Sequence, residues 1–398
     1  MPRAYSNALI VDGLGQAYEG HMVVAEGRID AVGPGPLPSS HRSLPVEDLA
    51  GKAVMPGMID CHVHLRSDGL ADTRAQTSAD SVGVATLRSA RNAQRTLECG
   101  VTTVRDCGSQ YGVDFALRQA ARQGLCKTPR LFLCGCMICM TGGHGWASGI
   151  EADGPDEVRR AARRLLKEGA DHIKLVASGG ILSPGTEIGA AQLTTEEMKA
   201  AVDEAHAAGK TACAHAHGTA AIKNAIRAGV DSIEHGYLID DEGIQMMVDR
   251  GTYLVATSTA VRNVVRHGIE AGIPADVVRK AQSAIDRHIS GFRRAHRAGV
   301  PMAMGTDSGV PFTRHGNNLD ELLYFVEMGM TPMEAICTAT RQGARLLRMD
   351  DRIGSLEAGK LADYVIVDGN PLEDIATLKD RIERVYIEGV QMHHGPAR

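Results

Sequence analysis

Short apolar stretches typical of β-strands alternate with amphipathic stretches typical of helices from about residue 53 to residue 350. Eight strand-like runs occur, near residues 54–61, 101–106, 130–136, 171–177, 211–216, 231–235, 252–257 and 301–306. Such alternation predicts parallel strands joined by helices, and eight repeats favour closure into a TIM, or (β/α)8, barrel. We therefore predict an α/β fold whose barrel spans residues 53–351.

Glycines and capping residues mark the expected element ends within the barrel. Five strands are preceded by a glycine that suits a helix C-cap: Gly100, Gly209, Gly229, Gly251 and Gly299. Amphipathic helices are expected over Asp156–Glu168 and Thr195–Ala208, and Thr194 is a plausible N-cap for the second.

The two ends of the chain have a different pattern. Residues 1–52 and 352–398 contain short strand-like runs with turn signals, such as those near residues 21–32 and 363–371. Two all-β tails on either side of a barrel most simply join into one unit. We predict a small composite β-sandwich domain built from both termini.

Composition limits the partners of the chain. The formal charge of -5 and the pI near 6.3 give no electrostatic reason to expect binding to nucleic acid or to a membrane surface. The first residues lack an apolar signal core, and nine cysteines fit reduced thiols, so we expect a cytoplasmic protein. The Cys134, Cys136 and Cys139 cluster lies in an apolar run and is interpreted as part of a buried strand. The oligomeric state stays open, a homo-oligomer included.

Side chains that can bind metals stand where the expected strands end. The apolar run from Val54 ends in His62 and His64, which point to the same side of a strand because they are two residues apart. Four further residues occupy equivalent positions at later strands: Lys174, His215, His235 and Asp307. In a TIM barrel these strand ends meet at one face, so the six residues predict a two-metal hydrolase site.

We expect His62, His64 and Asp307 to hold one divalent ion and His215 and His235 to hold the second. An ammonium cannot ligate a cation, so Lys174 is expected to carry a carbamate whose oxygens bridge ions about 3.5–4 Å apart. A hydroxide shared by two ions would attack a substrate carbonyl, and Asp307 would move the proton to the leaving nitrogen. The expected product is a cleaved amide.

Three polar residues near the barrel rim are candidates for contact with a small-molecule substrate. His144 lies among glycines after the third strand, and His217 and Tyr237 each follow a metal-ligand candidate by two residues. His288 is expected to be a solvated helix residue, and His315 is expected to be a solvated loop residue.

The chain resembles the amidohydrolase superfamily, in the branch of imidazolonepropionase-related proteins, prolidase-like dipeptidases and zinc carboxypeptidases. The resemblance covers nearly the whole chain. It rests on motifs around residues 56–64, 141–144, 173–180, 215–218, 233–236, 305–307 and 354–363. It implies two zinc ions, a carbamylated Lys174, and hydrolysis of a peptide or N-acyl bond next to a free carboxylate, with His144 and His217 contacting the substrate.

Departures from the relatives refine the expected activity. Imidazolonepropionases look mononuclear and lack a bridging lysine, so Lys174 argues against that activity. Some prolidase-like members carry Tyr at the position of His217, and a Cys-bearing insertion after that of His144, neither of which occurs here. A carboxypeptidase-like or N-acyl-amino-acid-hydrolysing enzyme is therefore expected. The alternatives are a cyclic amide, urea or carbamate hydrolase and a catalytically inactive scaffold.

Overall fold

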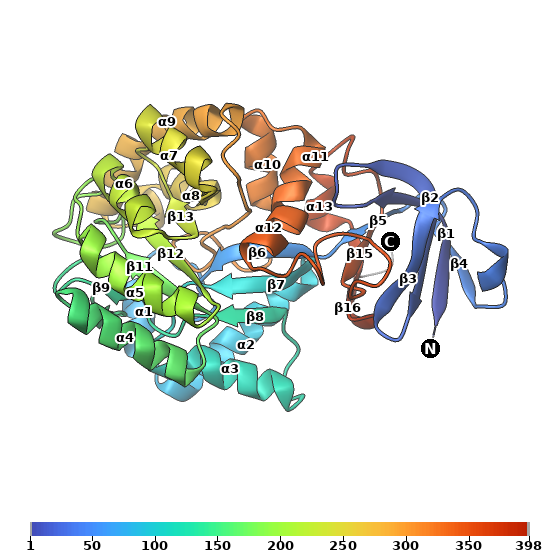
Figure 1. Cartoon of the computed structure of the whole chain (residues 1–398), viewed down its shortest axis with the longest axis horizontal. Coiled ribbons are helices and arrows are strands. Elements are labelled where there is room, and N and C mark those ends of the chain that lie inside the picture. Colours follow the sequence, from blue (N-terminus) through green and yellow to red (C-terminus); the bar gives the residue numbers. More distant parts are fainter. Residues whose placement is uncertain (1, 396–398) are drawn as a thin grey trace.

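The computed structural model describes residues 2–395, apart from the side chain of Arg74, and contains a ring of parallel strands (Figure 1). The regular strands of the ring are β6 (Met58–Val63), β7 (Val101–Asp106), β8 (Arg130–Leu133), β11 (His172–Val176), β12 (Thr211–Ala216), β13 (Ser232–His235) and β14 (Tyr253–Val255). They pair in parallel within two runs, from β6 to β8 and from β11 to β14. Seven of the eight expected strands are thus present as regular strands.

Hydrogen bonds at two places join these runs into a closed barrel. The Asp171 amide donates to the Leu133 carbonyl at 2.7 Å, which connects β8 to the start of β11. The eighth expected run, 301–306, is not a regular strand, but parallel bridges join Met302 to Leu254 and Ser308 to Val63. Short strands β9 (Ile138–Cys139) and β10 (Ile150–Glu151) extend the sheet beside β11.

Helices surround the strands on the outside of the barrel (Figure 1). They are α1 (Thr73–Ala79), α2 (Val82–Glu98), α3 (Val113–Arg122), α4 (Pro155–Glu168), α5 (Thr195–Ala207), α6 (Thr219–Ala228), α7 (Asp241–Arg250), α8 (Ser258–His267), α9 (Ala275–Arg297), α10 (Asp320–Glu327), α11 (Pro332–Cys337) and α12 (Gly343–Leu346). The two helices expected from periodicity are α4 and α5, and Thr194 caps α5 in a capping box with Glu197. Apolar faces of α4, α5 and α6 pack with the strands in one core.

The five glycines expected at helix C-termini all have positive φ angles, which a residue with a side chain adopts at a cost. Gly229 after α6 and Gly251 after α7, for example, have φ angles of 94° and 66°. These caps end each helix abruptly and return the chain to the next strand.

Both ends of the chain meet in a single eight-stranded sheet. Its strands are β1 (Arg3–Val11), β2 (Ala17–Ala25), β3 (Arg28–Pro34), β4 (Val46–Asp48), β5 (Ala53–Pro56), β15 (Tyr364–Val367), β16 (Ile382–Ile387) and β17 (Val390–His394), with α13 (Thr377–Asp380) before β16. The hydroxyls of Tyr5 and Tyr364 lie 2.8 Å apart, which links N-terminal and C-terminal strands in a buried core. The expected joining of the termini is therefore observed, and the two-layer packing of a sandwich stays a prediction.

One short strand that was predicted to belong to the barrel belongs to the terminal sheet. A boundary at residue 53 assigns Ala53–Pro56 to the barrel, whereas β5 pairs with β1 and β15 of the terminal sheet. The apolar run before His62 reads as one strand because β5 and β6 are both buried and are separated only by Gly57. A Cβ at Gly57 would lie 2.2 Å from the Thr102 hydroxyl, so the chain can pass β7 there only with glycine.

The terminal sheet packs firmly against the barrel. Val365, Val367 and Val385 belong to the core that continues into the barrel, whereas Tyr364 and Ile366 face the sheet's own core. This alternation places one face of β15 against the barrel and the other inside the terminal unit.

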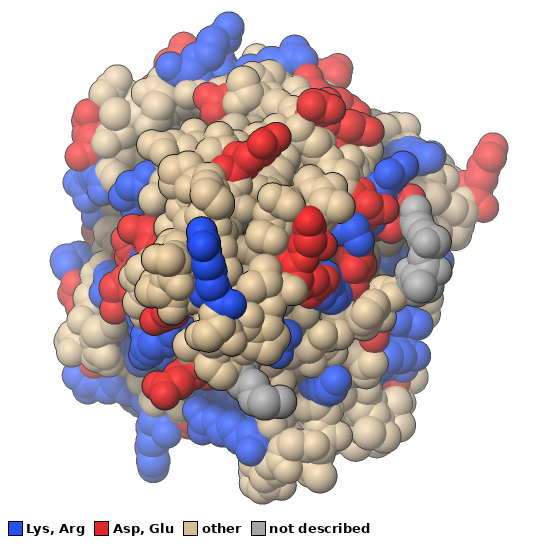
Figure 2. All heavy atoms as spheres, turned by 90° about the vertical axis from the view of Figure 1, so that its right-hand side faces the viewer, with Lys and Arg blue, Asp and Glu red and all other residues tan. Residues whose placement is uncertain are grey.

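Lysine and arginine side chains intermingle with aspartate and glutamate on the face at the terminal-sheet end (Figure 2). Within residues 2–395, helices long and apolar enough to span a bilayer are absent.

Candidate active site

The first two histidines converge on the aspartate that follows the eighth run. Asp307 Oδ1 lies 3.5 Å from His62 Nε2 and 3.2 Å from His64 Nε2. His62 Nδ1 donates to Glu234 Oε2 at 2.6 Å, and His64 Nδ1 contacts the Gly108 carbonyl oxygen at 3.4 Å. Because each Nδ1 is turned toward an oxygen, the Nε2 atoms are the ones that face the shared space.

A buried ion pair behind His62 is a part of the site that sequence reasoning missed. Glu234 Oε1 accepts hydrogen bonds from Arg105 Nη2 at 2.7 Å and from the Ser232 hydroxyl at 2.6 Å, and the side chains of Glu234 and Arg105 are fully buried. Burial lowers the pKa of Arg105, but Glu234 and the neighbouring cysteines together raise it, so that it lies well above its usual value. A glutamate and an arginine inside two expected barrel strands are the sequence signal that could have revealed this support.

Asp60 fixes the distance between the His62 strand and the Asp307 segment. Its carboxylate accepts from the His62 amide at 3.1 Å, the Thr306 hydroxyl at 2.7 Å and the Asn318 amide group at 2.8 Å. Burial raises the pKa of Asp60 to about 6 despite these hydrogen bonds. Asp60 therefore acts as a positioning residue between two strand ends.

Lys174 lies on β11 in the middle of the cluster, with 1% of its surface exposed. Its Nζ is 3.5 Å from His62 Nε2. Burial lowers the pKa of Lys174, but the Cys107 and Cys213 thiols and nearby carboxylates raise it, and the net pKa lies above the ordinary value. Carbamate formation requires the neutral amine, so we expect carbamylation to accompany metal binding.

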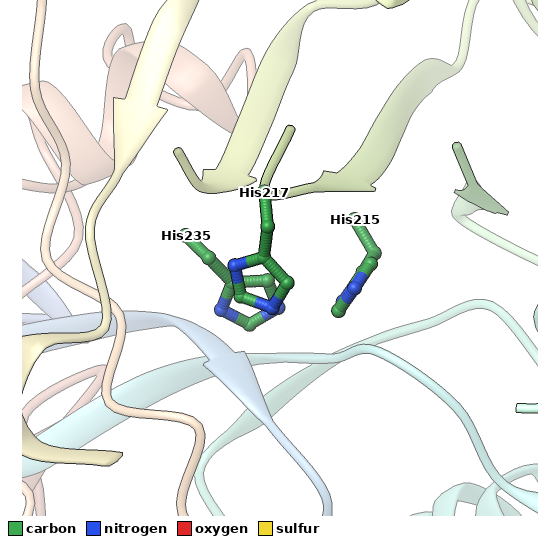
Figure 3. A group of neighbouring side chains, drawn as sticks. All are labelled: His215, His217 and His235. Atoms are coloured by element: carbon green, nitrogen blue, oxygen red, sulfur yellow. The ribbon is translucent and has the colours of Figure 1, made fainter. Parts of the chain in front are cut away.

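Three further imidazoles project into the same space: His215 from β12, His217 from the residue after β12, and His235 from the end of β13 (Figure 3). The rings of His217 and His235 stack at 4.8 Å, and the ring of His215 lies 4.6 Å from that of His235. His215 Nε2 contacts the Gly179 carbonyl oxygen at 3.4 Å, and His235 Nδ1 lies 2.7 Å from the Thr257 hydroxyl. The opposite nitrogens of His215 and His235 are therefore left to face a ligand.

The backbone adopts an unusual conformation at three of these strand ends. His235, Thr257 and Asp307 have φ angles of 73°, 48° and 61°, in the left-handed region that residues with side chains rarely occupy. Such strain costs of order 1–3 kcal/mol per residue and concentrates at functional sites. At His235 it also breaks the strand alternation, which explains how Glu234 and His235, adjacent in sequence, both serve the same cluster.

Four imidazoles of the cluster are held in their neutral form, whereas burial lowers the pKa of His64 but Asp307 and Asp106 raise it, and its net pKa lies above the usual value. Burial lowers the pKa values of His62, His215, His217 and His235 well below the usual value, and neighbouring imidazoles or Lys174 add to the effect. Neutral imidazole is the form that binds metals.

The donor set fits divalent ions. Asp307 Oδ1 and His217 Nδ1 are buried and have no hydrogen-bond partner among residues 2–395. Ligand atoms of His62, His235 and Asp307 lie within 4.8 Å of one another, as do those of His215, His217 and His235. Two overlapping groups of nitrogen and oxygen donors match the preference of zinc-like ions for imidazole and carboxylate.

The predicted substrate-contact residues line a cavity of about 260 Å³ beside the cluster. His144 Nδ1 is hydrogen-bonded to the Ser183 hydroxyl at 2.8 Å, and burial lowers the pKa of His144 to about 4. The Tyr237 hydroxyl donates to the Thr257 carbonyl oxygen at 3.1 Å, so its proton is already committed. Contact of His144, His217 and Tyr237 with substrate stays a prediction.

Two histidines expected to be solvated are buried instead. His288 on α9 packs its ring 4.6 Å from that of Tyr237 and is hydrogen-bonded to the Ser258 hydroxyl at 2.9 Å. His315 is 3.1 Å from both the Thr96 hydroxyl and the Ser67 carbonyl oxygen. Both support segments next to the cavity. His288 stands at helical spacing between Ala284 and Phe292 on the buried face of α9, a periodicity that could have indicated its burial.

A parallel α/β barrel with neutral imidazoles and a carboxylate gathered at the carboxyl ends of its strands has the layout of a barrel hydrolase. Residues 53–392 match the Amidohydrolase family. The chain belongs to this family, whose members typically bind divalent metals.

Relatives and solved structures agree with this assignment. The chain is 32% identical over 380 residues to an ochratoxinase of Aspergillus niger, covering 86% of this chain and 76% of the relative. It is 29% identical over 402 residues to an imidazolonepropionase of Rhizorhabdus wittichii, covering 90% of each chain. A crystal structure of a Xaa-Pro dipeptidase with bound methionine in its active site superposes with a TM-score of 0.90 at 34% identity, over 99% of this chain and 100% of that chain. These similarities confirm the predicted superfamily branch and the TIM barrel.

Proposed function

We propose that this enzyme hydrolyses the amide bond of a dipeptide or N-acyl amino acid next to its C-terminal carboxylate, with two divalent ions, zinc in the first instance. The observation that carries the proposal is the convergence of six predicted ligands on one buried space beside a substrate-sized cavity. Membership of the Amidohydrolase family supports amide hydrolysis as the reaction.

Different residues of the cluster would hold each of the two ions. His62, His64 and Asp307 would hold one ion, and His215 and His235 would hold the other, with a carbamate on Lys174 between them. Bound ions of this kind polarise a carbonyl group and lower the pKa of water. Glu234 keeps His62 in the tautomer that presents Nε2, and the ion pair with Arg105 holds the Glu234 carboxylate in position.

Asp307 is the proposed proton carrier. Burial raises the pKa of Asp307, but the neighbouring His62, His64 and Lys174 together lower it by more than burial raises it. The net pKa therefore lies below the ordinary value. Its carboxylate is therefore ionised at neutral pH, which is the form that would take a proton and pass it to the leaving nitrogen. His144 and His217, whose pKa values are lowered by burial, would hydrogen-bond the substrate beside it.

The relatives support a peptide-like substrate. The Xaa-Pro dipeptidase acts on a dipeptide, and the methionine in its active site is a free amino acid with an α-carboxylate. The imidazolonepropionase relative represents the alternative class of cyclic amide hydrolases.

A substrate panel tests the proposal. Zinc-reconstituted protein would be assayed by mass spectrometry with dipeptides, N-acyl amino acids, cyclic amides, ureas and carbamates. We expect dipeptides or N-acyl amino acids to have the highest kcat/KM. Preferential turnover of cyclic amides, ureas or carbamates would replace the proposal with that alternative, and turnover of nothing in the panel would favour an inactive scaffold.

A further inference from the structure

One buried arginine beside the metal-ligand cluster has no role in the proposed mechanism. Arg66 follows His64 by two residues, in the segment between β6 and α1, and it lines the same cavity as the cluster. Only 5% of its surface is exposed.

The contacts of Arg66 leave its charge without an anionic partner. Nη2 donates to the Thr77 carbonyl oxygen at 2.7 Å, Nη1 donates to the Gln110 side chain, and the guanidinium lies 5.6 Å from the centre of the Tyr111 ring. Within residues 2–395, Nε has no hydrogen-bond partner, and Arg66 forms no ion pair with aspartate or glutamate. Neutral groups thus orient the guanidinium without neutralising it.

Other arginines nearby are neutralised. Arg105, which is fully buried, pairs with Glu234 at 2.7 Å, and Arg88 pairs with Asp68 at 2.9 Å. Burying an uncompensated charge is costly, and an anion that enters beside it recovers part of that cost. Among the side chains that the structure describes around the cavity, Arg66 is therefore a cation that lacks, and can receive, an anionic ligand.

The cavity determines what kind of anion would fit. Arg66 and Lys174 are its only lysine or arginine residues among those the structure describes, and Lys174 lies within the cluster itself. The Tyr237 hydroxyl already donates to the Thr257 carbonyl oxygen, and His144 Nδ1 is hydrogen-bonded to the Ser183 hydroxyl. The remaining wall is largely apolar and includes Met137, Trp146, Ile181, Leu182, Val261 and Val264.

We propose that Arg66 binds the α-carboxylate of the substrate and that the substrate carries an apolar side chain against this wall. The planar guanidinium offers a fork that suits a carboxylate. The inference rests on the proposed function, since it assigns the group that recognises the free carboxylate of that substrate.

The test compares N-acetyl-L-methionine with its C-terminal amide on the wild-type protein, Arg66→Met and Arg66→Lys, all reconstituted with zinc. Binding is measured by calorimetry, and kcat/KM is measured where turnover occurs. We expect Arg66→Met to weaken binding and kcat/KM for the acid by about ten- to hundred-fold and to leave the amide nearly unchanged. For the acid, Arg66→Lys should have binding and kcat/KM values between those of the wild-type protein and Arg66→Met, because lysine keeps the positive charge and lacks the planar fork.

Arg91→Met is the matched control, since Arg91 is half-exposed and paired with Asp68. Thermal melting of each variant shows whether it has folded. The inference would be overturned in favour of a structural role if Arg66→Met weakened binding and kcat/KM equally for acid and amide. It would also be overturned if Arg66→Met failed to fold and Arg66→Lys bound and turned over acid and amide as the wild-type protein does. If the wild-type protein binds the acid through Arg66 but does not turn it over, the proposed reaction is refuted and the role of Arg66 in binding the carboxylate stands. If the wild-type protein shows no preference for the acid over the amide, that role of Arg66 is refuted.

Discussion

Lys174→Ala should lose activity by more than about 100-fold, because in the proposed ligand set Asp307 is assigned to one ion and only the Lys174 carbamate would supply oxygens to both. Lys174 is buried among His62, Asp307 and Glu234, and truncation to alanine leaves space where the carbamate would stand. Formate or acetate at high concentration should enter that space and restore part of the activity. The measurement is kcat/KM with and without added carboxylic acid, together with the metal content of the variant.

Rescue separates a bridging role from a structural one. A general loss of folding would not be reversed by a small carboxylic acid, and Lys199→Ala, at an exposed residue paired with Asp203, controls for the substitution itself. Full activity and full metal content in Lys174→Ala would show that the bridge assignment is wrong.

Asp307→Asn should lower kcat by about 10²–10⁴-fold, the usual contribution of general acid–base catalysis. Asparagine matches aspartate in size and tolerates the left-handed backbone conformation, so the φ of 61° at this position adds little new strain. The substitution therefore removes the proton-accepting carboxylate and keeps the local fold.

Circular dichroism, thermal melting and metal analysis of Asp307→Asn would establish that the variant is folded and loaded. Metal loss in the variant would point to the ligand role of Asp307, and retained metal with low kcat would point to its proton-transfer role. Near wild-type turnover would mean that another group, with His217 as the first candidate, is the base.

The barrel and the gathering of the six residues at one cavity could be predicted because both depend on local periodicity. Parallel strands buried on both faces read as short apolar runs, and side chains such as His215 and Asp307 interrupt those runs where each strand ends. Barrel topology then brings strand ends from distant parts of the chain to one face.

The supporting residues depend on contacts that local patterns do not encode. Glu234 could be linked to Arg105 and His62 only after three strands were placed side by side, and the positive φ of His235 hides its orientation from strand alternation. The burial of His288 likewise arises from packing between α8 and α9. The division between β5 and β6 was missed because both halves of that run are buried, one in each unit.

The central claim is that two ions, held by this cluster, are required for amide hydrolysis. Its most direct test is a zinc titration of chelator-treated protein, with bound metal measured by mass spectrometry and activity followed on the best substrate of the panel. The account predicts that activity rises until close to two metals are bound per chain. Full activity at one metal per chain would contradict it and support a mononuclear site.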